Sequence, residues 1–213
     1  MLFSLRCVSR SKSIIASRTN GRASSRTAAW AASTSVAWIY AALKRKKAMS
    51  ANALMFTCLT GSRTGEVLGL RWAELDFDQR LWICPAERMK TGEERRVPLT
   101  DEMLAILEPL KVLQSDYVFE GQKRHQPLSN MSMLMLLRRM QVEGGTVHGF
   151  RSTFRDWAAE VANVPREVAE KSLAHSVGSE VGRAYARSDL LEKRRDLMRL
   201  WSQFVTSGIR ECK

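Results

Sequence analysis

The amino-acid sequence predicts an α+β fold that is mainly α-helical and contains one small three-stranded antiparallel sheet. From about residue 35 onward, most of the chain has apolar residues at the i, i+3, i+4 spacing of amphipathic helices. Residues 75–99 instead have short apolar runs separated by turn residues, which favours strands. No apolar run approaches the roughly 18 residues of a membrane helix, so we expect no contact with a membrane.

The first predicted helix covers residues 36–43. The basic residues 44–47 that follow fit a solvated helix end, with a phosphate contact as the alternative. A second helix is expected to begin at Ser50 as N-cap, and its nearly continuous apolar run indicates burial on several sides. Gly61 interrupts it, after which Thr64 is the predicted cap of a short helix.

The predicted sheet starts with a hairpin. Residues 75–77 and 81–83 are its strands, and the polar triplet between them is its turn. Residues 95–99 form the third strand, where Pro98 indicates a sheet edge or a strand end. The turn before this strand would project Lys90 outward.

The rest of the chain is predicted to be helical. Thr100 caps a helix that Pro109 ends, and Ser129 caps a Met- and Leu-rich helix that runs to about Met140. Pro165 fits the first turn of a helix that leads to His175. The final helix has Leu190, Leu197, Trp201 and Phe204 as its apolar residues.

A further helix is expected from His148 onward. Its apolar stripe is Phe150, Phe154, Trp157, Ala158 and Val161. The same spacing places His148, Arg151 and Arg155 on another face, away from the core.

Charge is distributed unevenly along the chain. The net charge is +12, and residues 1–65 contain 11 Lys or Arg and no Asp or Glu. The remainder carries 23 basic and 22 acidic residues. Binding of a polyanion by this remainder would therefore need a local concentration of Arg and Lys, because its overall charge is nearly balanced.

Residues 1–35 are a basic leader rich in Ser and Arg, with no sustained periodicity. We expect this leader to be poorly ordered. Two alternatives stay open: an organellar transit peptide, and unrelated coding sequence fused to a truncated domain.

Metal chemistry is not predicted. The four cysteines (Cys7, Cys58, Cys84 and Cys212) form no Cys-x-x-Cys and share no zinc-like spacing with the histidines. Scattered single cysteines suit a reducing cytosol, where small buried thiols are common.

Six residues in a fixed order have the chemistry needed to move a phosphoryl group onto a protein hydroxyl. Arginines can hold the non-bridging oxygens, a lysine can protonate a leaving oxygen, and histidines can transfer protons near neutral pH. Glu66 can orient the first arginine through a charge-assisted hydrogen bond. The six residues are Arg63, Lys90, His148, Arg151, His175 and Tyr185.

Each of these residues alone also fits a structural role. Arg63 can be a surface arginine at a helix start, Lys90 a solvated turn lysine and His175 a hydrogen-bonded histidine near a helix end. Tyr185 can be a half-buried tyrosine. The ordered set, rather than any one member, carries the argument.

Five blocks of the sequence resemble the catalytic domain of the tyrosine recombinases, particularly phage-type integrases. The resemblance covers about residues 36–205, and the blocks occur in the family's order. The blocks are Leu59-Thr-Gly-Ser-Arg-Thr-Gly-Glu-Val-Leu-Gly-Leu-Arg-Trp72, Pro85-Ala-Glu-Arg-Met-Lys90 with Val97-Pro-Leu99, Val147-His-Gly-Phe-Arg-Ser-Thr-Phe-Arg-Asp-Trp157, Leu173-Ala-His175 and Ala184-Tyr-Ala-Arg187.

The resemblance implies a function and a partner. Tyr185 would attack a scissile phosphate of double-stranded DNA and form a 3′-phosphotyrosyl link, while Arg63 and Arg151 stabilise the phosphoryl oxygens. Lys90 would protonate the leaving 5′ oxygen, with help in proton transfer from His148 and His175. The family uses neither a metal nor a nucleotide, assembles as a tetramer on DNA and acts in the cytoplasm at the nucleoid. We accordingly expect no cofactor.

The resemblance also implies a domain division. Residues 36–213 would be the catalytic domain, and residues 1–35 are too short for the core-binding and arm-binding domains of such integrases. We therefore expect a truncated, weakly active integrase. Two alternatives share some of these features: a type IB topoisomerase-like enzyme and a non-catalytic DNA-binding remnant. A basic helical protein with no nucleic-acid role would require all five blocks to match by coincidence.

Overall fold

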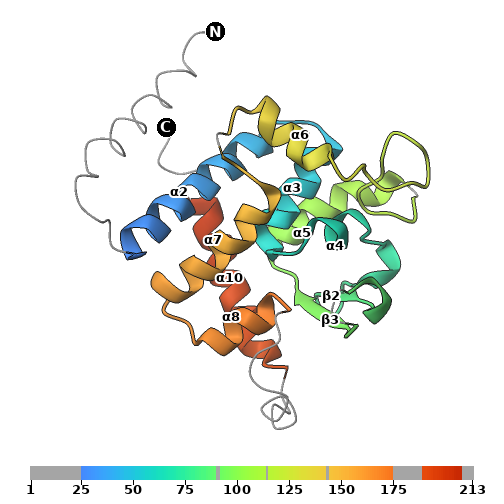
Figure 1. Ribbon diagram of the computed structural model, residues 1–213. Helices are drawn as coiled ribbons and strands as arrows, with labels where there is room; N and C mark the ends of the chain where they lie inside the picture. Colours follow the sequence, from blue (N-terminus) through green and yellow to red (C-terminus); the bar gives the residue numbers. More distant parts are fainter. Residues whose placement is uncertain (1–24, 90–91, 114, 143, 175–188, 208–213) are drawn as a thin grey trace.

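Helix α3 (Met49–Thr60) lies at the centre of the fold, in contact with helices from both halves of the chain. The computed structural model (Figure 1) describes residues 25–89, 92–113, 115–142, 144–174 and 189–207. The other α-helices are α2 (Ser25–Lys44), α4 (Thr64–Leu68), α5 (Asp101–Leu107), α6 (Ser132–Arg139), α7 (Val147–Glu160), α8 (Arg166–Ser172) and α10 (Leu191–Ser207).

The sheet is antiparallel, with strand order β1-β2-β3. Leu75 pairs with Trp82, and Leu81 pairs with Pro98. Pro98 ends an edge strand, as the sequence predicts, because proline has no N–H to donate to a further strand. The strands are β1 (Leu75–Asp76), β2 (Leu81–Cys84) and β3 (Arg95–Pro98), and short 3-10 helices lie at Trp72–Glu74, Ala86–Arg88 and Glu108–Leu113.

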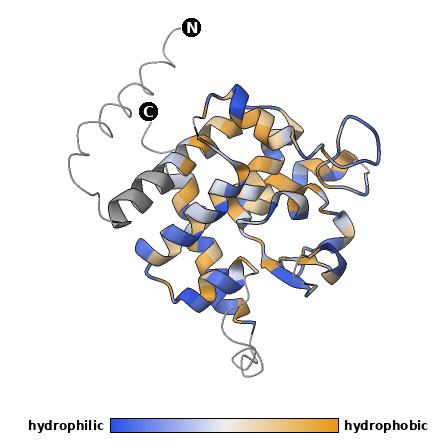
Figure 2. Cartoon of the chain, in the orientation of Figure 1, coloured by the Kyte–Doolittle hydropathy of each residue, from blue (hydrophilic) through white to orange (hydrophobic). Residues whose placement is uncertain are grey.

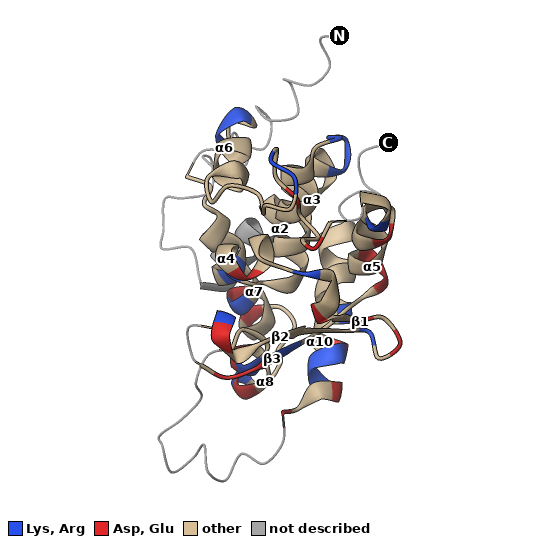
Figure 3. Ribbon diagram, turned by 90° about the vertical axis from the view of Figure 1, so that its right-hand side faces the viewer, with Lys and Arg blue, Asp and Glu red and all other residues tan. Residues whose placement is uncertain are grey.

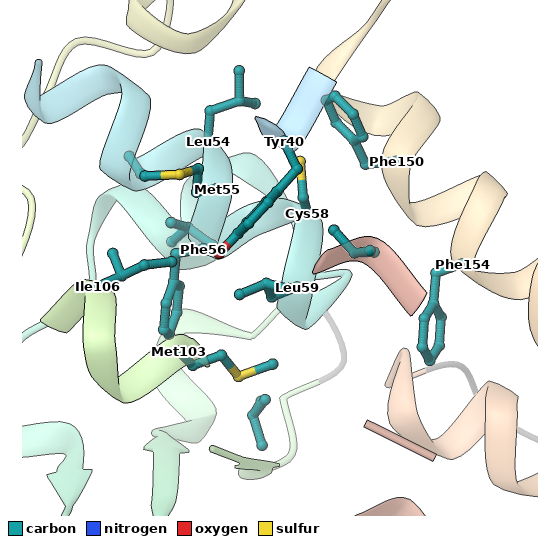
Figure 4. Packing of buried hydrophobic residues seen from close by; sticks show 14 of the residues in the cluster. Tyr40, Leu54, Met55, Phe56, Cys58, Leu59, Met103, Ile106, Phe150 and Phe154 are labelled. Atoms are coloured by element: carbon teal, nitrogen blue, oxygen red, sulfur yellow. The ribbon is translucent and has the colours of Figure 1, made fainter. Parts of the chain in front are cut away.

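The hydrophobic core forms around α3, which is buried at every position from Ala53 to Thr60. Helices α2, α5, α6, α7 and α10 contact it, and Figure 4 shows side chains from α3, α5 and α7 in this core. The Trp201 indole donates from Nε1 to the Cys58 carbonyl at 2.8 Å, which fixes α10 against α3. Figure 2 shows hydrophobic residues on the inward sides of the helices and hydrophilic residues at the surface.

The predicted fold class is confirmed: the described residues form a mainly helical α+β fold with one three-stranded antiparallel sheet. None of the described helices is both long and apolar enough to cross a membrane. Helix α2 begins at Ser25, earlier than the start predicted near residue 35, because residues 25–34 include four alanines and neither Gly nor Pro. The domain boundary at residue 36 stays a prediction.

Three predicted N-caps are wrong. Ala48, with an extended backbone, caps α3 in place of Ser50, which lies inside the first turn. Arg63 caps α4 in place of Thr64, because Glu66 accepts its backbone N–H. Met131 precedes α6. Ser129, the expected cap, accepts the N–H of Met131 at 3.3 Å, so its hydroxyl stabilises the preceding turn.

Candidate active site

Arg63 and Glu66 form the first part of the site, at the start of α4. The Glu66 carboxylate accepts a hydrogen bond from Arg63 Nη1 at 2.7 Å through Oε1 and one from the Arg63 backbone N–H at 3.1 Å through Oε2. The Glu66 side chain is 4% exposed, whereas that of Arg63 is 28% exposed. Glu66 therefore fixes a guanidinium that solvent can still reach.

Arg95, on β3, contacts the same carboxylate. Its Nη1 donates to Glu66 Oε2 at 2.7 Å and to Ser62 Oγ at 3.0 Å. Its Nη2 donates to the Ser172 carbonyl at 2.6 Å. Burial alone would raise the pKa of Glu66, but the charges of Arg95 and Arg63 outweigh it, so the pKa lies below its ordinary value.

Arg151 joins two loops from its position on α7. Its guanidinium donates from Nη1 to the Gly61 carbonyl at 2.9 Å and from Nη2 to the Leu173 carbonyl. Burial, followed by the neighbouring charges of Arg95 and Arg63, lowers the pKa of Arg151 to about 10, so it stays charged at neutral pH. The sequence placed Arg151 on a face away from the core, and this is wrong: the residue is 3% exposed. Its long side chain reaches carbonyls that helical spacing alone does not reveal.

His148 lies in the first turn of α7 and is exposed. Thr146 caps this helix, because its Oγ1 accepts the N–H of Gly149 at 3.0 Å. The helix therefore begins as early as the sequence prediction required, and His148 and Arg151 are one helical turn apart. Figure 3 shows basic and acidic residues close together where α4, α7 and α8 approach the sheet.

Lys90, His175 and Tyr185 lie outside the described residues. The structure therefore brings together Arg63, Glu66 and Arg151 among the predicted site residues. Among the residues that the structure describes, no group of three or more His, Cys, Asp or Glu side chains is arranged to hold a metal ion.

Sequence reasoning missed Arg95. It interpreted Arg95-Arg96 only as the start of an edge strand. Strand alternation was the available signal, because neighbouring side chains on a strand face opposite sides and Val97 is buried on the same side as Arg95. An arginine on the buried face of a strand requires an anionic partner. The sequence did not show that Glu66 is that partner.

Comparison with known protein sequences finds a matching family model and similar curated proteins. A model of the phage integrase family matches residues 30–192. Prophage integrase IntA of Escherichia coli K12 is 39% identical over 166 residues, which cover 76% of this chain and 40% of that protein. The integrase of enterobacteria phage P4 is 31% identical over 183 residues, 77% of this chain and 42% of that protein. The chain thus spans about two fifths of the length of these curated relatives.

Solved structures share the fold at lower sequence identity. The lambda integrase catalytic core has a TM-score of 0.51 and 18% identity, covering 68% of this chain and 91% of that one. A lambda integrase tetramer bound to a Holliday junction has a TM-score of 0.52 and 18% identity, covering 73% and 47%. XerA recombinase has a TM-score of 0.54 and 16% identity, covering 83% and 60%.

Proposed function

Because this chain belongs to the phage integrase family and has the fold of a tyrosine recombinase catalytic domain, we propose that it cleaves and rejoins double-stranded DNA at specific sites. The relatives are integrases and recombinases by name, which favours strand exchange over simple relaxation of supercoils. The division of the chain that goes with this function, a catalytic domain from residue 36 to residue 213, is part of the proposal.

In the proposed reaction, the Tyr185 hydroxyl attacks the scissile phosphorus. The bond from phosphorus to the 5′ oxygen breaks, and a 3′-phosphotyrosyl link forms. Lys90 gives a proton to the leaving 5′ oxygen, and the proton of the tyrosine passes to His148 or His175. One phosphodiester replaces another, so the step needs neither a nucleotide nor an external energy source. Attack by a 5′ hydroxyl reverses the sequence and rejoins a strand.

The arginines would stabilise the charge that develops on the phosphoryl oxygens. Arg63 supplies an accessible guanidinium that Glu66 holds in place. A guanidinium has five N–H donors, so Arg151 retains donors beyond those that bind the carbonyls of Gly61 and Leu173. Because Arg151 is buried, contact with a phosphate would require DNA to approach between the loops that it joins.

The observation that carries this proposal is the link that Arg151 makes between two separate blocks. Gly61 lies two residues before Arg63, and Leu173 lies two residues before His175. One buried side chain thus holds the main chain beside two residues of the proposed site. We further propose that the chain self-associates on DNA as a tetramer, supported by the lambda integrase tetramer of the same fold.

The test uses suicide substrates. The purified chain is incubated with a pool of nicked duplexes of randomised sequence, and protein-linked DNA is captured under denaturing conditions and sequenced. We expect a covalent adduct with an enriched sequence that Tyr185→Phe abolishes. DNA binding without an adduct would instead identify a non-catalytic DNA-binding protein. Relaxation of supercoiled plasmid without an enriched sequence would identify topoisomerase-like activity.

A further inference from the structure

Arg95 connects three segments that are distant in the sequence. Its guanidinium, on β3, binds Ser62 and Glu66 around the start of α4 and the Ser172 carbonyl at the end of α8. Its side chain is 3% exposed, and among the described residues its Nε has no hydrogen-bond partner. An arginine at this depth costs desolvation energy, and a buried ion pair such as Arg95–Glu66 adds little net stability compared with a well-packed pair of apolar side chains.

The two oxygens of the Glu66 carboxylate have different partners. Oε1 binds the Arg63 guanidinium, while Oε2 is held by Arg95 and by the Arg63 backbone N–H. With Oε2 fixed from the β3 side, the carboxylate has one orientation in which Oε1 points at Arg63. Removal of Arg95 would leave Oε2 with the Arg63 backbone N–H alone, so the carboxylate, and with it the Arg63 guanidinium, would be held less firmly.

The second nitrogen of Arg95 acts on another part of the site. Its bond to the Ser172 carbonyl fixes the end of α8, three residues before His175. Arg151 fixes the next carbonyl, that of Leu173. Two buried guanidinium groups therefore hold consecutive carbonyls of the chain that leads to His175.

We propose that Arg95 is a positioning residue for DNA cleavage, which holds the Glu66 carboxylate against Arg63 and fixes the main chain before His175. Arg95 is buried and acts through these groups, not on the phosphate itself. The inference rests on the proposed function. It adds Arg95, on β3, to the residues that cleavage requires.

The test compares two variants that separate charge from geometry. Arg95→Gln removes the positive charge, and Arg95→Lys keeps the charge but cannot reach all three acceptors at once. Arg80→Gln is the matched control, because Arg80 precedes β2 and forms an exposed pair with Asp101. The rate of adduct formation on the enriched nicked duplex is measured under single-turnover conditions, with folding checked by circular dichroism.

Dependence on pH distinguishes positioning from a purely structural role. In Arg95→Gln, the buried Glu66 loses the charge that most lowers its pKa, so it takes up a proton at higher pH and releases Arg63. The ratio of wild-type to variant rates cancels the titration of the histidines. The charged and titratable groups around Glu66 are Arg63, Arg88, Arg95, Arg151 and Cys84.

We expect Arg95→Gln to cleave roughly 10-fold more slowly than wild type near about pH 8 and roughly 100-fold more slowly near about pH 5.5. Arg95→Lys should show a deficit that does not change with pH, and Arg80→Gln should cleave at the wild-type rate. A folded Arg95→Gln protein with the wild-type rate, or with a deficit constant over pH, would overturn the inference and leave the proposed function standing. So would unfolding of both Arg95 variants. Failure of the wild-type chain to form any adduct would overturn the proposed function, and this inference with it.

Discussion

The guanidinium of Arg151 and the carbonyl of Gly61, 90 positions apart in the sequence, are joined by a buried hydrogen bond of 2.9 Å. The same guanidinium binds the Leu173 carbonyl, so α7 fixes the loop before α4 and the end of α8 together. Gly61 has a φ of 60°, a left-handed conformation that ends α3 and turns its chain toward Arg63. The geometry of the site thus depends on Arg151, a residue that has a structural role and, in the proposed reaction, also a catalytic one.

Arg151→Lys should therefore lower both stability and cleavage. A lysine ammonium cannot bind both carbonyls in the geometry of the planar guanidinium, so one buried acceptor loses its partner. We expect the free energy of unfolding to fall by about 2 kcal/mol, as measured by urea denaturation. Adduct formation should fall by roughly 100-fold.

Arg155→Lys is the matched control on the same helix. Arg155 is exposed, and its contact with Asp156 is a 3.8 Å surface pair. Because surface pairs contribute at most about 1 kcal/mol, we expect little change in stability. Equal losses in the two variants would contradict the structural account of Arg151.

Local pattern predicted most of the fold because each helix and strand has its own periodicity. The sequence predicted the apolar stripe from Phe150 to Trp157, the hairpin around residues 78–80 and the edge position of Pro98. Helix starts were predicted less well. Ser50 and Ser129 are residue types that cap helices, but α3 and α6 begin after other residues. A capping side chain is a preference of about 1 kcal/mol, which packing can override.

The sequence predicted only part of the arrangement of the site. The spacing of Arg63 and Glu66 predicted their ion pair, because Glu66 follows Arg63 by three residues at the start of a helix. Burial of Arg151 and the role of Arg95 depend on acceptors 22 to 90 positions away. No local pattern encodes such contacts, so tertiary structure had to supply them.

The Glu66 carboxylate should make stability depend on pH in the acid range. Its folded pKa lies below the ordinary value of 4.5, so its contribution is complete above about that pH and is lost as pH falls through the folded pKa. Glu66→Gln removes this contribution. We expect the melting temperatures of wild type and variant to differ most at neutral pH and to converge below about pH 4. A difference that is constant from neutral to acid pH would contradict the assigned ionisation.

Gly69 leaves room for the guanidinium of Arg88. A Cβ at Gly69 would lie 2.7 Å from Arg88 Nη2, and that nitrogen donates to the Glu66 carbonyl at 2.6 Å. Gly69→Ala should displace Arg88 and lower the free energy of unfolding by about 1–2 kcal/mol in urea denaturation.

Gly65→Ala provides the comparison, since nothing lies within 4 Å of a Cβ there. Alanine is the better helix former by about 1 kcal/mol, so this variant should be as stable as wild type or more stable. Equal destabilisation by the two substitutions would show that contact with Arg88 is not the cause.

Asp189, four residues after Tyr185, forms ion pairs with Arg194 on α10 and Arg96 on β3. Its Oδ1 accepts from Arg194 Nη1 at 2.7 Å, and its Oδ2 lies 3.3 Å from Arg96 Nε. Arg194 in turn donates to the carbonyl of Arg96, so α10 and β3 are joined at this point. Since Asp189 is four residues from the proposed nucleophile, Asp189→Asn should weaken the position of Tyr185 more than it weakens the fold.

We expect Asp189→Asn to slow adduct formation by roughly 10-fold while the free energy of unfolding falls by only about 1 kcal/mol, since the Asp189 side chain is 30% exposed and its ion pairs are partly screened. Single-turnover cleavage of the nicked duplex and urea denaturation measure the two effects. Asp196→Asn serves as control, because Asp196 pairs with Arg199 on the exposed side of α10. If both aspartate variants cleave at the wild-type rate, the link between Asp189 and β3 serves stability alone, because a displaced nucleophile would slow the reaction even in a fully folded protein.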